Sequence, residues 1–277
     1  MVIISDLIFR YSKKQPALFE NLDCELTAGS IVGLLGKNGA GKTTLLKLMV
    51  GLLRPSEGTV SVMEHEPAAR QPSLLEDVYF LPEELHHPGV SIKKYVQANS
   101  GFYPRFDNDL LSRLIVDFDL TDNKNLNELS YGQKKKFLIS FALSTRCRLL
   151  VLDEPTNGLD IPSKSTFRKV MAGSLNDDQL VIISTHQVRD VENLIDRVIM
   201  LEKGKFIMQK SIYDISSKLQ FTTTTSAEGE NILYREMVPG GYKVITPQTG
   251  ESSSSVDIEL LFNAISNSAE KMNEYVK

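Results

Sequence analysis

The chain has 277 residues, 42% of them hydrophobic and 24% charged, which is enough for one large α/β domain with a small addition. Its net charge of -4 argues against a broad nucleic-acid-binding surface, so we expect no nucleic-acid partner. Cys24 and Cys147 lie far apart without metal-ligand spacing, which favours two reduced thiols. No apolar run approaches the roughly 18 residues of a membrane helix, and the N-terminus lacks the basic region of a secretory signal. A cytoplasmic location is expected.

The first eighty residues are predicted to contain mostly strands. Residues 1–28 have the pattern of short strands, and Ser30–Leu35, "SIVGLL", has that of a buried strand. A helix is expected from Lys42 to about Gly51. The segment "RPSEGTVSVM" then predicts a turn and a strand, and Val78–Leu81 predicts another strand before Pro82.

The loop between the buried strand and the first helix, "GKNGAGKTT", has the glycine spacing of a phosphate-binding loop. Its backbone N–H groups would surround a β-phosphate, the Lys42 ammonium would meet the β- and γ-phosphates, and the Thr43 hydroxyl would ligate Mg²⁺. The alternative, a glycine-rich turn without a ligand, is disfavoured by the flanking strand and helix. The nucleotide-binding candidates are Gly36, Lys37, Asn38, Gly39, Ala40, Gly41, Lys42, Thr43 and Thr44.

From about Ser91 to Thr145 the pattern becomes helical, which indicates a helical insertion, about residues 86–146, in an α/β core. Within it, the segment "LSYGQKKKF" predicts a helix capped by Ser130. Gly132 would let an anion approach the free N–H groups at this helix start, so the segment also has the character of a phosphate site. His86 and His87, which precede Pro88, are expected to be surface residues.

The next strands carry polar residues at their ends. "LLVLDEP" places Asp153 and Glu154 at the end of an apolar strand, where a doubly wound sheet binds its ligands. Asp153 suits a Mg²⁺ shell, and Glu154 suits a general base that activates a water. The strand Leu180–Ser184 ends in "STHQ", which places His186 at the same edge of the sheet. There it could hydrogen-bond the γ-phosphate or the attacking water. A solvated edge and a structural histidine are the alternatives.

The last part of the chain changes composition. Arg197–Leu201 and Phe206–Gln209 predict a hairpin, and residues after about 213 are rich in Ser and Thr. "NILYREMVPGGYKVIT" predicts a second hairpin around Pro239, and an amphipathic helix is expected from Ser255. We therefore expect residues 213–277 to form a small β-plus-helix accessory domain that tunes assembly and adds no phosphate-site residue.

Together these motifs resemble the nucleotide-binding domain of ATP-binding cassette (ABC) proteins, across about residues 1–212. The motifs are the phosphate loop Gly36–Thr44, the signature Leu129–Gln133, the strand ending Asp153-Glu154, the loop Asn157–Asp160, and His186. The resemblance implies an α/β P-loop fold with an antiparallel β subdomain, ATP and Mg²⁺ as ligands, and ATP hydrolysis. It also implies that Tyr11 stacks on adenine. The alternative for Tyr11 is a strand-end core residue.

In this family two cassettes pack head to tail, so the signature of one chain covers the nucleotide held by the other. The resemblance thus implies that Ser130, Gly132 and Gln133 act in trans, and that Asp160 lies at the dimer interface. Two residues depart from the family pattern. Tyr131 replaces the common glycine of the signature, and Glu83 stands where glutamine is usual. We expect Glu83 to be linked to the metal; its alternative is a solvent-facing side chain.

In this family, a subunit without a membrane span implies a separate permease as its partner. The cassettes themselves would pair as a homodimer or a heterodimer. The location expected for such a subunit is peripheral, on the cytoplasmic face of the cell membrane. The stretch "FYPRFDNDLL" resembles cassettes of drug- and antibiotic-type exporters. The alternatives are an importer ATPase and a soluble regulatory or mechanical ABC ATPase that is not coupled to transport.

Overall fold

A computed structural model describes residues 1–85, 88–121, 124–225, 231–250, 254–268, 272 and 274–275. Within these residues the central sheet has six strands, in the order β5-β6-β7-β3-β8-β9. In that order the strands are Val78–Leu81, Leu149–Asp153, Leu180–Thr185, Ser30–Leu35, Arg197–Glu202 and Lys205–Ser211. Neighbouring strands from β5 to β8 are parallel, and β9 pairs antiparallel with β8, so the predicted hairpin is confirmed. His86 and His87, which were expected at the surface, lie outside the described residues.

Both faces of this sheet are covered, which explains why its strands are continuous apolar runs. Leu150 and Leu152 of β6 belong to one hydrophobic cluster, with residues of α5 (Tyr131–Ser144) and α6 (Ile161–Ser174). Leu149 and Val151 belong to the other, with residues of α1 (Lys42–Met49). Every residue of β6 is buried. The strand ends are therefore fixed on a rigid support.

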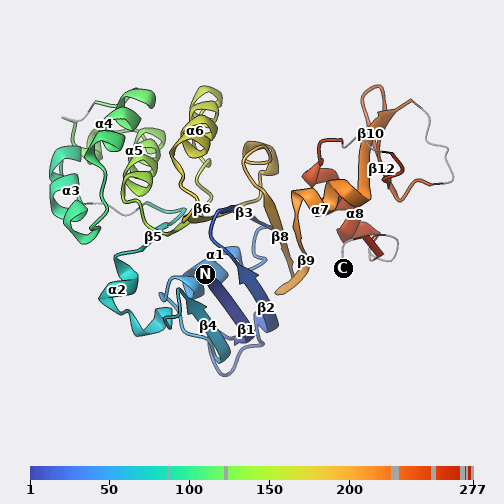
Figure 1. The fold of residues 1–277 in the computed structure, drawn as a ribbon, viewed down its shortest axis with the longest axis horizontal. Coiled ribbons are helices and arrows are strands. Elements are labelled where there is room, and N and C mark those ends of the chain that lie inside the picture. Colours follow the sequence, from blue (N-terminus) through green and yellow to red (C-terminus); the bar gives the residue numbers. More distant parts are fainter. Residues whose placement is uncertain are drawn as a thin grey trace.

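An antiparallel sheet covers α1 from the far side (Figure 1). Its order is β2-β1-β4, with β2 at Phe19–Leu26, β1 at Val2–Phe9 and β4 at Glu57–Val62. Buried and exposed side chains alternate along the second half of β2, as one-sided burial requires. The expected antiparallel β subdomain is present, and a short α2 (Pro72–Leu75) leads from it toward β5.

The helices expected between residues 91 and 145 are present as α3 (Ile92–Asn99), α4 (Asn108–Asp117) and α5. They stand to one side of the central sheet in Figure 1. Phe141 of α5 is 1% exposed and has ring centroids between 5.1 and 6.4 Å from those of five other aromatic residues. These are Tyr79, Tyr95, Tyr103, Phe106 and Phe137. This aromatic cluster joins the helices to β5.

The C-terminal part forms a sheet of order β10-β12-β11, flanked by α7 (Ile212–Lys218) and α8 (Ile258–Asn267). The strands are Leu219–Thr224, Gly241–Pro247 and Tyr234–Val238. Val238 pairs with Gly241, so the hairpin predicted around Pro239 is confirmed. Strand β10 was not predicted, because its threonine run was interpreted only as a change of composition.

The C-terminal part shares its hydrophobic core with the central sheet. Ile258 and Leu261 of α8 are buried in the same cluster as Ile183 of β7 and Val191. The predicted amphipathic helix thus has its apolar face covered by the rest of the chain. No helix in the described ranges is both long and apolar enough to cross a bilayer.

The aromatic cluster predicts that Phe141→Ala strongly destabilises the helices of this region. Removal of a fully buried Phe costs about 3–5 kcal/mol in free energy of unfolding. Phe102→Ala is the matched control, because Phe102 is 68% exposed, and we expect it to change that free energy by less than about 0.5 kcal/mol. Urea unfolding followed by circular dichroism measures both; equal losses for the two variants would contradict the cluster's role.

Candidate functional site

The phosphate loop is held between β3 and α1 by a close contact at its last glycine. Gly41 has φ of 105°, in the left-handed region, and a Cβ there would lie 2.7 Å from Cε1 of Phe19. The loop therefore needs glycine at this position for two reasons. Helix α1 begins at Lys42, and the Lys42 Nζ donates to the carbonyl of Gly36 at 2.8 Å, which folds the lysine back over the loop.

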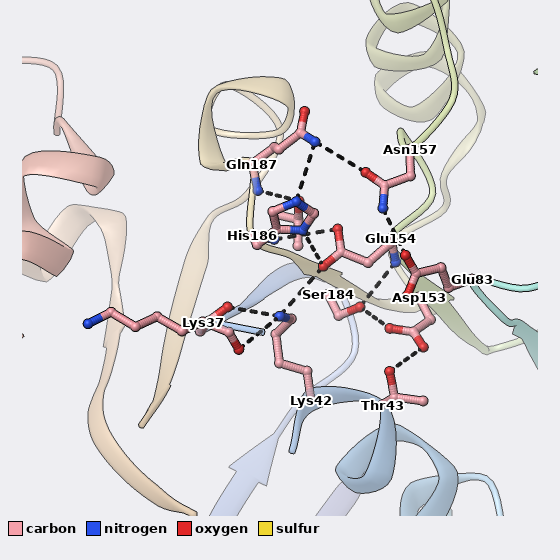
Figure 2. Close-up of polar contacts among 12 residues, drawn as sticks. Lys37, Lys42, Thr43, Glu83, Asp153, Glu154, Asn157, Ser184, His186 and Gln187 are labelled. Atoms are coloured by element: carbon pink, nitrogen blue, oxygen red, sulfur yellow. Dashed lines mark hydrogen bonds and ion pairs between the residues drawn. The ribbon is translucent and has the colours of Figure 1, made fainter. Parts of the chain in front are cut away.

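Three strand ends converge on one carboxylate. The Lys42 Nζ lies 3.5 Å from Oε1 of Glu154, and the Nδ1 of His186 lies 2.9 Å from the same oxygen. The side chains of Lys42 and Glu154 are 7% and 4% exposed. Figure 2 shows these residues meeting from β3–α1, β6 and β7. Glu154 has φ of 46°, a left-handed conformation that glutamate rarely adopts, directly after the end of β6.

A second set of hydrogen-bonded side chains lies beside the contacts of Glu154. The Thr43 hydroxyl donates to Oδ2 of Asp153 at 2.7 Å, and the Ser184 hydroxyl donates to the other Asp153 oxygen. The backbone N–H of Glu154 donates to the carbonyl oxygen of Ser184 at 3.1 Å. Ser184 was not predicted as a site residue, although its place at the end of β7, two residues before His186, was the available signal.

Lys42, Thr43 and Glu154 line a cleft of about 380 Å³. Its wall contains Tyr11, Leu18, Asn38, Gly39, Ala40, Gly41, Lys42, Thr43, Thr44, Glu83 and Glu154. Tyr11 is 63% exposed, with its ring edge-on to Phe9 at 5.0 Å between centroids and its hydroxyl 2.5 Å from Oγ1 of Thr44. The ring is therefore attached at the cleft mouth with its surface still accessible, which does not fit the alternative of a strand-end core residue.

Glu83 is linked to the strand-end cluster through neutral side chains. Its Oε1 accepts from Nδ2 of Asn157 at 2.9 Å, and Oδ1 of Asn157 accepts from Nε2 of Gln187 at 3.3 Å. The same Gln187 nitrogen lies 3.4 Å from Nε2 of His186. Glu83 is exposed, and it lines the cleft. Gln187 was not predicted, and only its place in "STHQ" could have indicated it.

The signature residues form a well-capped helix start outside this cleft. The Ser130 hydroxyl accepts from the N–H of Gln133 at 3.2 Å, and the Gln133 side chain accepts from the N–H of Ser130 at 3.0 Å. A Cβ on Gly132 would lie 2.9 Å from the carbonyl oxygen of Gly158, so this helix start packs closely on the loop after Glu154. Ser130, Gly132 and Gln133 are not among the described residues that line the cleft.

Asp160 caps the next helix. Its carboxylate accepts from the N–H of Ser163 at 2.9 Å at the start of α6. Hydrogen bonds from Ser163 lower the pKa of this carboxyl, with a smaller contribution from the charge of Lys136. Asp160 is exposed and ionised, at the end of the loop that contacts the signature helix.

The C-terminal part reaches the edge of the site. Phe262 of α8 lines a small pocket together with Gly36, Lys37 and His186. The Arg189 Nε, in the short helix after His186, donates to Oε2 of Glu259 at 2.8 Å. Residues beyond 213 therefore contact the segment that carries His186. Phe262 does not line the cleft of Tyr11 and Glu154, so the expectation that this part adds no phosphate-site residue stays a prediction.

A metal ion would find oxygen ligands at one corner of the cleft. Thr43 and Asp153 already share a hydrogen bond, and Glu83 lines the same cleft. Among the described residues no group of three or more His, Cys, Asp and Glu side chains forms a metal cage. A hydroxyl and one or two carboxylates fit Mg²⁺ bound chiefly through phosphate oxygens and water.

Comparisons with known proteins agree with this geometry. A family model described as ABC transporter matches residues 19–157. The SkfA peptide export ATP-binding protein SkfE of Bacillus subtilis (strain 168) is 30% identical over 194 residues, covering 68% of this chain and 80% of that protein. The high-affinity zinc uptake system ATP-binding protein ZnuC of the same organism is 28% identical over 220 residues, covering 74% and 92%.

The solved dimeric structure of an ATP-binding cassette in a post-hydrolysis state, bound to ADP and Pi, has the same fold. It superposes with a TM-score of 0.67 at 19% identity, covering 76% of this chain and 98% of that chain. The predicted fold class, an α/β P-loop cassette with an antiparallel sheet, is confirmed. The chain belongs to the ABC transporter family, as an ATP-binding subunit with ATPase activity.

Proposed function

We propose that the cleft binds ATP with Mg²⁺ and that Glu154 is the general base that activates the attacking water. The observation that carries this proposal is the contact of Lys42 and His186 with one buried oxygen of Glu154. When the γ-phosphate enters, Lys42 would turn from Glu154 to the phosphate oxygens, because they carry more negative charge. Glu154 would then be free to accept a proton, with His186 beside it to orient the water or the γ-phosphate.

Thr43, Asp153 and Glu83 would hold the Mg²⁺, and the backbone N–H groups of residues 36–44 would surround the phosphates. Bound Mg²⁺ neutralises charge that develops on the β- and γ-phosphate oxygens. Glu83 would contribute through its carboxylate, which is a better ligand for a hard cation than an amide oxygen. Its hydrogen bond to Asn157 supports this role, since that bond keeps the carboxylate at the cleft wall.

We further propose that each nucleotide is shared by two chains. The N-terminus of α5, with Ser130, Gly132 and Gln133, would complete the site of a second cassette, because a helix N-terminus attracts phosphate. The position of these residues outside their own cleft supports the proposal. Asp160 would lie at the interface between the chains. ATP would then stabilise the dimer and its hydrolysis would release it.

The work of this cycle would be passed to a separate membrane permease, with the chain at the cytoplasmic face of the membrane. We propose export as the direction, from the stretch "FYPRFDNDLL" and from the similarity to SkfE, which is named as a peptide export protein. The similarity to ZnuC, which is named as a zinc uptake protein, makes import the second candidate. Reconstitution with its permease in vesicles tests the direction: ATP-dependent accumulation of cargo inside right-side-out vesicles would contradict export.

The proposed base predicts that Glu154→Gln still binds ATP while kcat falls by about 10²–10⁴, since the amide keeps the shape and cannot accept the proton. The variant should accumulate as an ATP-bound dimer in size-exclusion chromatography. Glu20→Gln, at an exposed position of β2, is the matched control and should keep turnover. A Glu154→Gln chain that stays monomeric at saturating ATP would count against the shared site.

The exposed ring at the cleft mouth predicts a loss of ATP affinity in Tyr11→Ala. Loss of a base-stacking aromatic ring costs about 1–3 kcal/mol, a rise in Kd of about 5-fold to 150-fold. Tyr11→Phe keeps the ring and removes only the hydroxyl that contacts Thr44, so it should bind nearly as tightly as the unsubstituted chain. Isothermal titration with a non-hydrolysable ATP analogue compares them; an unchanged Kd in Tyr11→Ala would exclude stacking.

A further inference from the structure

The residue after His186, Gln187, is held in place by a lysine of α6 and by its own backbone. The Lys164 Nζ lies 2.7 Å from Oδ2 of Asp190 and donates to Oε1 of Gln187 at 3.2 Å. The backbone N–H of Gln187 donates to the hydroxyl of Thr185 at 2.9 Å, and Thr185 is buried. Gln187 itself is exposed, yet these contacts fix both its backbone and the oxygen of its amide.

A series of side-chain hydrogen bonds leads from Lys164 through Gln187 and Asn157 to Glu83, and its two ends fix the amides between them. A lysine ammonium can only donate, and a carboxylate can only accept. Because Lys164 donates to the Gln187 oxygen, the Gln187 nitrogen is left to donate to Oδ1 of Asn157, at 3.3 Å. The Asn157 nitrogen then donates to Oε1 of Glu83 at 2.9 Å. Each donor thus meets an acceptor, and the series has one direction.

The same Gln187 nitrogen faces the ring of His186, as Figure 2 shows. It lies 3.4 Å from Nε2 of His186, while the other ring nitrogen, Nδ1, lies 2.9 Å from Oε1 of Glu154. The Glu154 carboxylate accepts, so Nδ1 carries the ring hydrogen, and in the neutral ring Nε2 is then an acceptor. The Gln187 N–H is the matching donor. The ring therefore lies between an acceptor at one nitrogen and a donor at the other.

We propose that Gln187 is a positioning residue that fixes the tautomer and the orientation of the His186 ring. Lys164 and Asn157 set the direction of the Gln187 amide, and this amide directs its N–H to the ring. The Nδ1–H of His186 then stays on Glu154. The inference rests on the proposed function, because its effect on turnover passes through His186 to the proposed base. Gln187 is not among the described residues that line the cleft, so it has no direct contact with the nucleotide there.

NMR of the histidine ring nitrogens, in a chain with isotope-labelled histidine, tests the tautomer directly. The chain has four histidines, and the signals that disappear in His186→Ala belong to His186. At a pH where the ring is neutral, the unsubstituted chain should show hydrogen on Nδ1 and none on Nε2. Gln187→Glu can only accept, so it should move hydrogen onto Nε2. Hydrogen on Nε2 in the unsubstituted chain, or the same ring signals in both chains, would overturn the inference.

Turnover shows whether Gln187 acts through His186. Gln187→Met keeps the length of the side chain and removes the amide, and it should lower kcat about tenfold, since a displaced catalytic group slows the reaction. The KM for ATP should change less than about twofold. In the His186→Ala background the same substitution should lower kcat less than about twofold, because the ring on which it acts is gone. Equal losses in both backgrounds indicate a merely structural role and would overturn the inference.

The matched control is Gln97→Met, which replaces an exposed glutamine of α3 and should leave both kcat and the His186 signals unchanged. If His186→Ala has no measurable turnover, the NMR comparison decides, because a packing role leaves the tautomer as it is. The tautomer is measured without nucleotide, so the inference can fail while the chain still hydrolyses ATP. Absence of ATP turnover in the unsubstituted chain would instead contradict the proposed function.

Discussion

The contact of the Lys42 ammonium and the His186 ring with one oxygen of Glu154 is the interaction on which the site depends. It can form only because β3, β6 and β7 are parallel neighbours whose carboxyl ends meet at one edge of the sheet. The covered faces of the sheet then keep those ends in register. Packing far from the cleft, such as Leu150 and Leu152 against the helices, thus determines the geometry of the strand ends that carry Glu154 and His186.

Charge balance is the second constraint. Buried carboxylates repel one another, and a triphosphate would add further negative charge. The chain supplies a cation from the start of α1, since the Lys42 Nζ lies 3.5 Å from Oε1 of Glu154. The Nζ of Lys135 and the hydroxyl of Tyr131 both donate to the backbone carbonyl of Glu83, so the signature helix and the loop of Glu83 are linked within one chain. The Asn157 amide adds a neutral link between Glu83 and the loop after Glu154.

Local motifs predicted the strand ends and the phosphate loop well, because a glycine loop between a strand and a helix and a carboxylate after an apolar run are properties of neighbouring residues. Contacts between distant segments could not be predicted in this way. Ser184 and Gln187 form hydrogen bonds with Asp153 and Asn157, which lie about thirty positions away in the sequence. The burial of Lys135 could not be predicted either, because this residue lies in a run of three lysines, a pattern typical of a solvated face. The approach of Phe262 to the phosphate loop depends on how the whole C-terminal part folds back.

The central claim is that one ATP is shared between two chains, and complementation between two inactive variants tests it most directly. Lys42→Met disables the phosphate loop. Ser130→Asp keeps a good helix cap but places a negative charge where the partner's γ-phosphate would lie. Each variant alone should be inactive. A shared site predicts that mixing them restores ATP turnover, because a heterodimer combines the intact loop of one chain with the intact signature of the other. No recovery in mixtures that form heterodimers would contradict a shared site.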